Sequence, residues 1–294
     1  MRLHLVDGTY ELFRAHYSGR PGHKTPDGRE RKAVVGLAAS MLALLSDAGE
    51  AVTHLAVAFD NPIASFRNAL FDGYKHDAGV PPDLRAQFDD AEDAVRALGI
   101  VVWSMKDVEA DDAIATGAKR FAPEVDQVRI LSPDKDFGQC LDGTRVVMVD
   151  RMRGKVIDEA AYVAKMGVRP ASVPDFLALV GDTADGIPGV PGVGEKSAAA
   201  LLAVYGRLED IPRDPSTWTC KLRGADAIAR AIAEHAEEAL LWRRLATLVT
   251  DAPITPSLDE LRWAGVPRDA FTQWCDALGV RDLRERGLRA AIAQ

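Results

Sequence analysis

The 294-residue chain has few cysteines and aromatic residues and no long apolar segment. Its three cysteines (Cys140, Cys220 and Cys275) form no CxxC pair and cannot make an even disulfide framework, which fits a reducing cytoplasm. No apolar run reaches the length of a membrane span. The N-terminal MRLHLVDGTYELF carries an acid at its seventh position, which favours a first strand over a signal peptide. We therefore expect a cytoplasmic protein without membrane contact.

Basic residues are in the minority, with 36 Lys and Arg against 44 Asp and Glu and a formal net charge of −8. Because phosphate affinity comes from Lys and Arg, this balance argues superficially against nucleic acid. Net charge is a weak test here, since clustered acids account for the excess and bound cations would offset part of it. Basic residues are locally dense at 20–24 and 29–32 and recur at Arg67, Lys75 and Arg85, although solvated surface is the ordinary explanation of such runs.

Nine carboxylates fall in short clusters where predicted strands or helices end. They are Asp7, Asp60, Glu109, Asp111, Asp112, Asp134, Asp136, Asp182 and Asp185. Gathered like charges repel and raise each other's pKa, so such clusters indicate a cation. Mg²⁺ and Mn²⁺ prefer oxygen ligands, and two such ions together commonly cut phosphodiesters. Each cluster also has a simpler explanation as a turn or a helix cap, but one acid would suffice for capping.

The first half of the chain alternates strands with helices. Strands are predicted at 3–6, 55–59, 100–103, 128–131 and 145–149, and helices at 33–45, 89–98 and 110–121. This order indicates crossover connections and a mostly parallel α/β sheet with helices on both faces. Ligands of such sheets bind at the carboxyl ends of the strands, where Asp7, Asp60 and Asp134 are expected.

The second half of the chain is predicted to be helical. From about residue 159 helices follow at 160–166, 173–180, 196–205 and 225–248, and the last 40 residues also appear helical. A Gly/Pro-rich loop, IPGVPGVGEKSA at 187–198, precedes one of these helices. A helix N-terminus behind a glycine loop binds phosphate, and Lys196 and Ser197 could add donors. A plain helix–helix connection is the alternative, but it seldom needs so many glycines, and the loop is no Walker A motif.

Together these segments closely resemble the bacterial and phage 5′-nuclease family, which includes flap endonucleases and the N-terminal 5′–3′ exonuclease domain of DNA polymerase I. The matching motifs are LVDG (5–8), FD (59–60), SFR (65–67), GYK (73–75), EADD (109–112), DKD (134–136) and GDxxDxIPGVxGVGEKSA (181–198). The resemblance covers roughly residues 1–250. Because single motifs are weak, their number and order carry it.

The resemblance implies a PIN-like, Rossmann-like nuclease core with a helical arch and a C-terminal helical DNA-binding subdomain. On this chain the core would span 1–158, with the arch at about 68–90. The helical subdomain would span 159–294, with a helix–three-turn–helix motif at about 182–205. We expect a stand-alone form without a polymerase.

The resemblance also implies the site residues. Two or three Mg²⁺ or Mn²⁺ ions are expected. The first metal site would be formed by Asp7, Asp60, Glu109, Asp111, Asp112 and Asp134. The second would be formed by Asp136, Asp182 and Asp185, with Asp134 shared. Lys75 and Arg67 match residues that contact the scissile phosphate, and Tyr74 matches an aromatic that stacks on an unpaired base. The DNA-binding set would be completed by Gly192, Gly194, Lys196 and Ser197, and K⁺ would bind the backbone carbonyls of Ile187, Val190 and Val193.

Two departures from the family pattern bear on function. Gly186 replaces the usual Asn after the second acid of GDxxD, which is expected to loosen that turn, and the segment after Lys75 is less basic than in many relatives. A catalytically weak junction-binding protein is therefore an alternative to an active enzyme. A toxin-type ribonuclease with the same acidic core is a third hypothesis, which the helical half and the Gly/Pro loop argue against.

The function that follows is a structure-specific 5′ nuclease, acting as a 5′-flap endonuclease and a 5′–3′ exonuclease. It would hydrolyse DNA near flaps, nicks or gaps by two-metal-ion catalysis, including RNA–DNA primers during Okazaki fragment processing and repair. We expect a nucleoid-associated monomer. A DNA polymerase or a sliding clamp is compatible with this role, but the sequence shows no clamp-binding peptide.

Overall fold

The computed structural model describes residues 1–255 and 257–290, which form two compact units. Of the described residues, the first unit comprises 1–64, 77–132, 250–255 and 257–290, and the second comprises 65–76 and 133–249. Each unit is built from separate segments of the chain, whereas the prediction divides the chain once, near residue 158. The division into a nuclease core and a DNA-binding subdomain therefore stays a prediction about function.

A parallel sheet forms the core of the first unit. Its strands are β1 (Arg2–Asp7), β2 (His54–Asp60), β3 (Val101–Met105) and β4 (Gln127–Leu131), in the spatial order β3-β2-β1-β4. All three pairings are parallel. β1 and β2 are almost entirely buried, because strands covered by helices on both faces consist of continuous apolar runs. The predicted mostly parallel sheet is confirmed.

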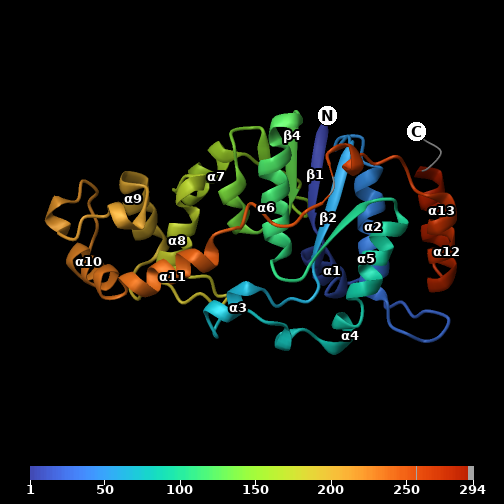
Figure 1. The fold of residues 1–294 in the computed structure, drawn as a ribbon, viewed down its shortest axis with the longest axis horizontal. Helices are drawn as coiled ribbons and strands as arrows, with labels where there is room; N and C mark the ends of the chain where they lie inside the picture. The colour runs from blue at the N-terminus through green and yellow to red at the C-terminus, as the bar shows by residue number, and fades with distance from the viewer. Residues whose placement is uncertain (256, 291–294) are drawn as a thin grey trace. The chain divides into compact units, whose positions relative to one another are not determined.

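The sheet of the first unit carries helices on both faces (Figure 1). The helices of this unit are α1 (Gly8–His16), α2 (Lys32–Leu45), α4 (Pro82–Arg85), α5 (Phe88–Ala97), α6 (Ala110–Phe121), α12 (Arg268–Leu278) and α13 (Arg281–Ala290), with 3₁₀ turns at Asp77–Gly79, Ala122–Glu124 and Asp259–Leu261. α12 packs against α5, and α13 packs against α2. α6 packs along all four strands, and α2 packs against α1 and α5. None of the helices in the described parts of the chain is both long and apolar enough to span a bilayer.

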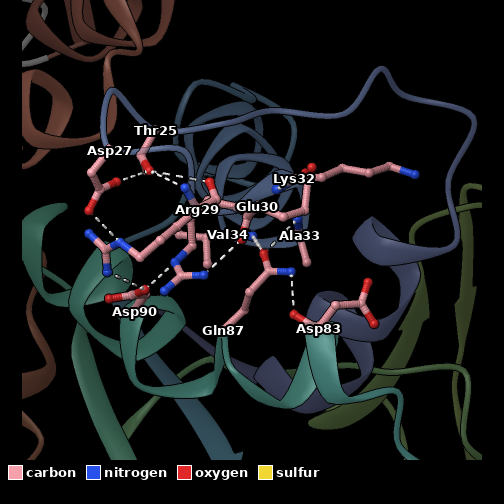
Figure 2. A network of polar contacts seen from close by, with 11 residues as sticks. Thr25, Asp27, Arg29, Glu30, Lys32, Ala33, Val34, Asp83, Gln87 and Asp90 are labelled. Atoms are coloured by element: carbon pink, nitrogen blue, oxygen red, sulfur yellow. Dashed lines mark hydrogen bonds and ion pairs between the residues drawn. The ribbon is translucent and has the colours of Figure 1, made fainter.

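A polar network holds the loop between α1 and α2 against α5 (Figure 2). Arg31 donates to Asp90 of α5, and Glu30 accepts from the backbone N–H of Lys32 at 3.1 Å. Arg31, the N-cap of α2, gives no side-chain cap. The buried Gln87 supplies it instead, because its Oε1 accepts from the N–H of Ala33 at 3.1 Å. A glutamine distant in sequence thus satisfies the start of α2.

A second polar network lies at the start of β1. His4 is fully buried and its Nε2 lies 3.0 Å from Glu50 Oε2, while Arg129 on β4 donates to Glu50 Oε1 at 3.1 Å. Burial lowers the pKa of His4, so its ring is neutral at pH 7 and Nε2 donates. The hydrogen bond from His4, with the charge of Arg129, lowers the pKa of Glu50 to about 2 although burial opposes the shift. A charged Glu50 therefore stabilises the fold.

We expect the substitution Glu50→Gln to cost about 1 kcal/mol at pH 7, a modest figure because solvent screens the half-buried pair. A depressed folded-state pKa contributes stability that is complete above the unfolded-state pKa, near 4.5, and is lost as the pH falls toward about 2. The gap between wild type and variant should therefore close across this window. Urea unfolding at pH 7, 4.5 and 3 measures it, and a gap that stays constant with pH would contradict the assignment.

The second unit is mainly helical. It contains β5 (Val146–Asp150) and β6 (Lys155–Ile157), paired antiparallel, and the helices α3 (Phe66–Leu70), α7 (Glu159–Met166), α8 (Val173–Val180), α9 (Glu195–Tyr205), α10 (Ala225–Glu234) and α11 (Ala236–Ala246). Short 3₁₀ turns lie at Lys135–Cys140, Pro170–Ser172, Leu208–Asp210 and Pro215–Thr217. α8 is strongly apolar and packs against α9 and α11. Among the described residues after 159 the structure has helices and no strand, as predicted.

Candidate metal centre

Three acids of the second unit converge on one point. One carboxylate oxygen each from Asp136, Asp182 and Asp185 lies within 4.8 Å of the others. Asp136 belongs to the 3₁₀ turn Lys135–Cys140, and the other two belong to the turn after α8. That turn is closed by reciprocal backbone hydrogen bonds of 2.8 Å between Asp182 and Ile187. The structure thus brings together three of the four residues that the resemblance assigns to the second metal site.

The acid trio fits a cation. Asp136 is 6% exposed, and its Oδ1 is buried without a hydrogen-bond partner. Burial, followed by the charges of Asp134, Asp185 and Asp182, raises the pKa of Asp136 well above its usual value. A buried carboxylate oxygen without a donor, set among other carboxylates, is costly unless a cation neutralises it. Oxygen ligands of this kind suit Mg²⁺ or Mn²⁺.

Two lysines already pair with the trio. Lys135 Nζ lies 2.9 Å from Asp182 Oδ2, and Lys75 Nζ lies 3.0 Å from Asp185 Oδ1. Burial by itself would lower the pKa of Lys135, but its hydrogen bond to Asp182 and the surrounding acids outweigh burial and raise it. The ammonium groups therefore offset part of the negative charge. These pairings could not be predicted from the sequence, because the partners are far apart in the chain.

A tyrosine supports the turn that carries Asp136. The hydroxyl of Tyr162 donates to the carbonyl oxygen of Lys135 at 2.9 Å. A Cβ at Gly138 would lie only 2.2 Å from the Tyr162 ring, so glycine is required at this close approach. Burial, with the charges of Asp136 and Asp134, raises the pKa of Tyr162, which keeps the hydroxyl protonated as a donor. Sequence reasoning missed Tyr162, because nothing near it in the chain marks its role.

Asp134 has a different position from the trio. Its side chain is exposed and accepts from the N–H of Asp136 at 3.0 Å, which caps the 3₁₀ turn. Among the described residues, the carboxylate oxygens that lie within 4.8 Å of one another belong to Asp136, Asp182 and Asp185, and Asp134 is not in this group. Its predicted role as a ligand shared by two metal sites stays a prediction.

Five of the six acids predicted for the first site belong to the first unit, and Asp134 belongs to the second. Asp7 ends β1, accepts from the N–H of Tyr10 at 2.8 Å, and accepts from the Ser132 hydroxyl at 3.2 Å. Asp60 ends β2, and its Oδ1 accepts from the N–H of Ala110 at 2.8 Å. Because Ala110 is the first residue of α6, Asp60 reaches the start of the helix that carries the EADD acids.

The EADD acids cap the helix that they begin. Glu109 and Asp112 form a reciprocal capping box at the start of α6, with the N–H of Glu109 donating to Asp112 Oδ2 at 3.0 Å. Both are buried, and Asp111 is partly exposed. Helix capping, the simpler explanation of this cluster, therefore accounts for two of its three acids, Glu109 and Asp112. A carboxylate has two oxygens and can cap and ligate at once, so a first metal site stays a prediction.

Arg67 and Tyr74 are more buried than their predicted contacts with DNA require. Arg67 is 1% exposed and donates from Nε to the carbonyl oxygen of Leu245 at 2.7 Å and from Nη2 to that of Thr247 at 2.9 Å. Its guanidinium satisfies carbonyl oxygens at the end of α11, and its contact with the scissile phosphate stays a prediction. Tyr74 is 2% exposed, which does not allow its ring to stack on a base in this conformation. Lys75 is partly exposed beside the acid trio.

The Gly/Pro loop turns closely at the end of α8. A Cβ at Gly189 would lie 2.4 Å from the backbone nitrogen of Gly181, so a larger residue cannot fit. Gly192 and Gly194 face open space, and Gly194 is the N-cap of α9 without a side-chain cap. Lys196 is exposed and Ser197 partly so, both in the first turn of α9. This arrangement suits an anion at the helix start.

The predicted K⁺ carbonyls belong to the same loop. The carbonyl oxygen of Ile187 accepts from the N–H of Asp182, and that of Val190 accepts from the N–H of Val193. The side chains of Ile187, Val190 and Val193 are buried. Each carbonyl oxygen keeps a second lone pair, so a role of these three in cation binding stays a prediction.

A mostly parallel sheet and a helical unit carrying a carboxylate trio beside a glycine hairpin define a nuclease-like α/β class of protein. Residues 2–167 match the family described as 5′–3′ exonuclease, N-terminal resolvase-like domain, and residues 168–269 match the 5′–3′ exonuclease C-terminal SAM fold. The chain therefore belongs to the 5′–3′ exonuclease family, and the predicted family is confirmed.

The curated relatives include DNA polymerases. The chain is 36% identical to DNA polymerase I of Pseudomonas aeruginosa over 301 residues, covering 96% of this chain and 32% of the polymerase. It is 35% identical to DNA polymerase I of Mycobacterium leprae over 299 residues, covering 99% and 32%. The chain thus spans about a third of the length of these relatives.

Solved structures share the fold. The zinc-bound T5 5′-exonuclease superposes with a TM-score of 0.67 at 18% identity, covering 100% of this chain and 99% of that one. The catalytic core of Rad2 in complex with a DNA substrate superposes with a TM-score of 0.62 at 15% identity, covering 99% and 91%. The predicted fold class is confirmed by these likenesses.

Proposed function

We propose that this chain is a divalent-metal-dependent, structure-specific 5′ nuclease. It would act on DNA as a 5′-flap endonuclease and a 5′–3′ exonuclease. The observation that carries the proposal is the acid trio around the buried, unpartnered oxygen of Asp136, in a chain of the 5′–3′ exonuclease family. The T5 exonuclease with bound metal and the Rad2 core with bound DNA support the choice of cofactor and substrate.

Separate groups of residues would bind the metal ions, the scissile phosphate and the DNA duplex. Asp136, Asp182 and Asp185 would hold one divalent ion, and the acids at the edge of the parallel sheet would hold another. Such ions, Mg²⁺ or Mn²⁺, activate water and stabilise the leaving oxygen. Lys75 would offset charge on the scissile phosphate. Lys196 and Ser197, at the start of α9, would bind the duplex backbone, with K⁺ at the hairpin carbonyls.

Several finer features belong to the same proposal. The substrates would be flapped, nicked or gapped junctions, including RNA–DNA primers, because unpaired ends cost little to bring to the metals. We expect a monomer at the nucleoid in the cytoplasm. The junction-binding alternative rests on Gly186 and on the less basic segment after Lys75. A Cβ at Gly186 would lie 2.1 Å from the carbonyl oxygen of Gly73, which gives this glycine a packing reason.

The proposal is tested with a 3′-labelled double-flap DNA and the same labelled strand alone, each incubated with Mg²⁺, Mn²⁺ or EDTA. We expect cleavage at the junction with either metal and none with EDTA. The single strand should be cut far more slowly. Tight binding of the double flap without cleavage in either metal would favour the junction-binding alternative and reject the enzyme.

A further inference from the structure

The segment that carries Lys75 is fixed to the turn that carries Asp185. The backbone N–H of Lys75 donates to the carbonyl oxygen of Asp185 at 3.0 Å. The side chain of Asn68, on α3, donates to the carbonyl oxygen of Lys75 at 2.9 Å. Both backbone groups of Lys75 are thus engaged within the same compact unit. This anchoring keeps the Cα of Lys75 beside the turn of Asp185, within reach of its carboxylate for the lysine side chain.

Gly186 makes the close approach of the two segments feasible. It has φ +75°, and a Cβ there would lie 2.1 Å from the carbonyl oxygen of Gly73. Any side chain at 186 would therefore push the segment 73–75 away from the turn. A left-handed conformation alone would admit Asn, but this contact does not. The contact with Gly73 gives the departure at 186 a physical reason.

The consequence is an ion pair inside the metal centre. Lys75 Nζ lies 3.0 Å from Asp185 Oδ1, and Asp185 is one of the three converging acids. Both side chains are largely shielded, with 29% and 15% exposed. A cation that approaches Asp185 has to compete with this ammonium, whose backbone is anchored to the same turn.

We propose that Lys75 is a built-in counter-ion of this metal centre, positioned by the contact between Gly186 and Gly73. A divalent ion entering the trio weakens the hold of Asp185 on the ammonium, which is then available for a phosphate. The inference rests on the proposed function only in that the trio binds a divalent ion. Because linkage is reciprocal, fixing Lys75 on Asp185 lowers cation affinity, and removing the contact raises it.

Calcium binding to the whole chain without DNA, measured by titration calorimetry, tests the proposal. We expect Lys75→Met and Gly186→Asn each to bind Ca²⁺ about three- to tenfold more tightly than wild type. The double variant should bind no more tightly than the better single variant, because both changes break one contact. Gly186→Asn keeps the net charge, so a general electrostatic gain does not explain its effect.

Control variants distinguish a specific ion pair between Lys75 and Asp185 from a general effect of removing a positive charge. Lys165→Met removes an exposed lysine on α7 and should leave affinity nearly unchanged. Asn68→Ala, also neutral, should act like Gly186→Asn and serves if that variant does not fold. Equal effects of Lys75→Met and Lys165→Met, or unchanged affinity in both neutral variants, would overturn the counter-ion role. If wild type and Asp136→Asn bind Ca²⁺ equally weakly, the metal centre itself fails, and the counter-ion role with it.

Discussion

Asp136→Asn is expected to abolish metal-dependent cleavage while making the metal-free protein more stable. Asp136 is buried among acids, and one of its oxygens has no hydrogen-bond partner. Its raised pKa means that the folded state resists the charge at pH 7. Asparagine removes the charge at nearly constant volume, which should add about 1–3 kcal/mol of stability in EDTA. Loss of a metal ligand should slow cleavage roughly 10³-fold.

Urea unfolding in EDTA and in Mg²⁺, together with flap cleavage, measures both effects. Wild type should gain stability from Mg²⁺, and Asp136→Asn should gain much less. The control Asp142→Asn removes an exposed acid of the same unit and should change neither quantity. Cleavage at the wild-type rate by Asp136→Asn, or lower stability in EDTA, would contradict a role of this acid in cation binding.

The strands and most helices follow from local patterns. Continuous apolar runs predicted β1, β2 and β4 to within a residue or two, and α6 and α8 have the predicted bounds. α1 was missed, because β1 passes directly into it and Asp7 serves as both the last strand residue and the N-cap. β6 was missed because it has only three residues, too few to show a periodic pattern, and two of them are exposed.

The sequence predicted the metal-binding acids of the site but not the residues that hold or pair with them. Acids at element ends indicated a metal centre, and resemblance grouped Asp136 with Asp182 and Asp185, which the structure brings together. The pairing of Lys75 with Asp185 could not be predicted, since it depends on where distant segments pack. The same holds for Tyr162 beneath the turn of Asp136. Local chemistry marks the ligands, whereas their supports come from tertiary packing.

Arg67 shows how a motif can identify a residue without revealing what its side chain contacts in the fold. The SFR motif and the nearby Lys75 suggested a phosphate contact. In the structure its guanidinium meets the carbonyl oxygens of Leu245 and Thr247, at the C-terminus of α11. The last carbonyls of a helix lack intrahelical donors and carry partial negative charge, which a buried cation satisfies well. Burial, not sequence, reveals this capping role.

We therefore expect Arg67→Met to destabilise the protein by about 2–4 kcal/mol, because it leaves buried carbonyls without their donors. Arg67→Lys should recover only part of this, since an ammonium cannot reproduce the forked geometry. Urea unfolding measures the loss, with Arg223→Met as the exposed-arginine control. Cleavage by the folded fraction of Arg67→Met should remain within a few fold of wild type. Wild-type stability combined with a kcat more than 100-fold lower would instead support the contact of Arg67 with the scissile phosphate.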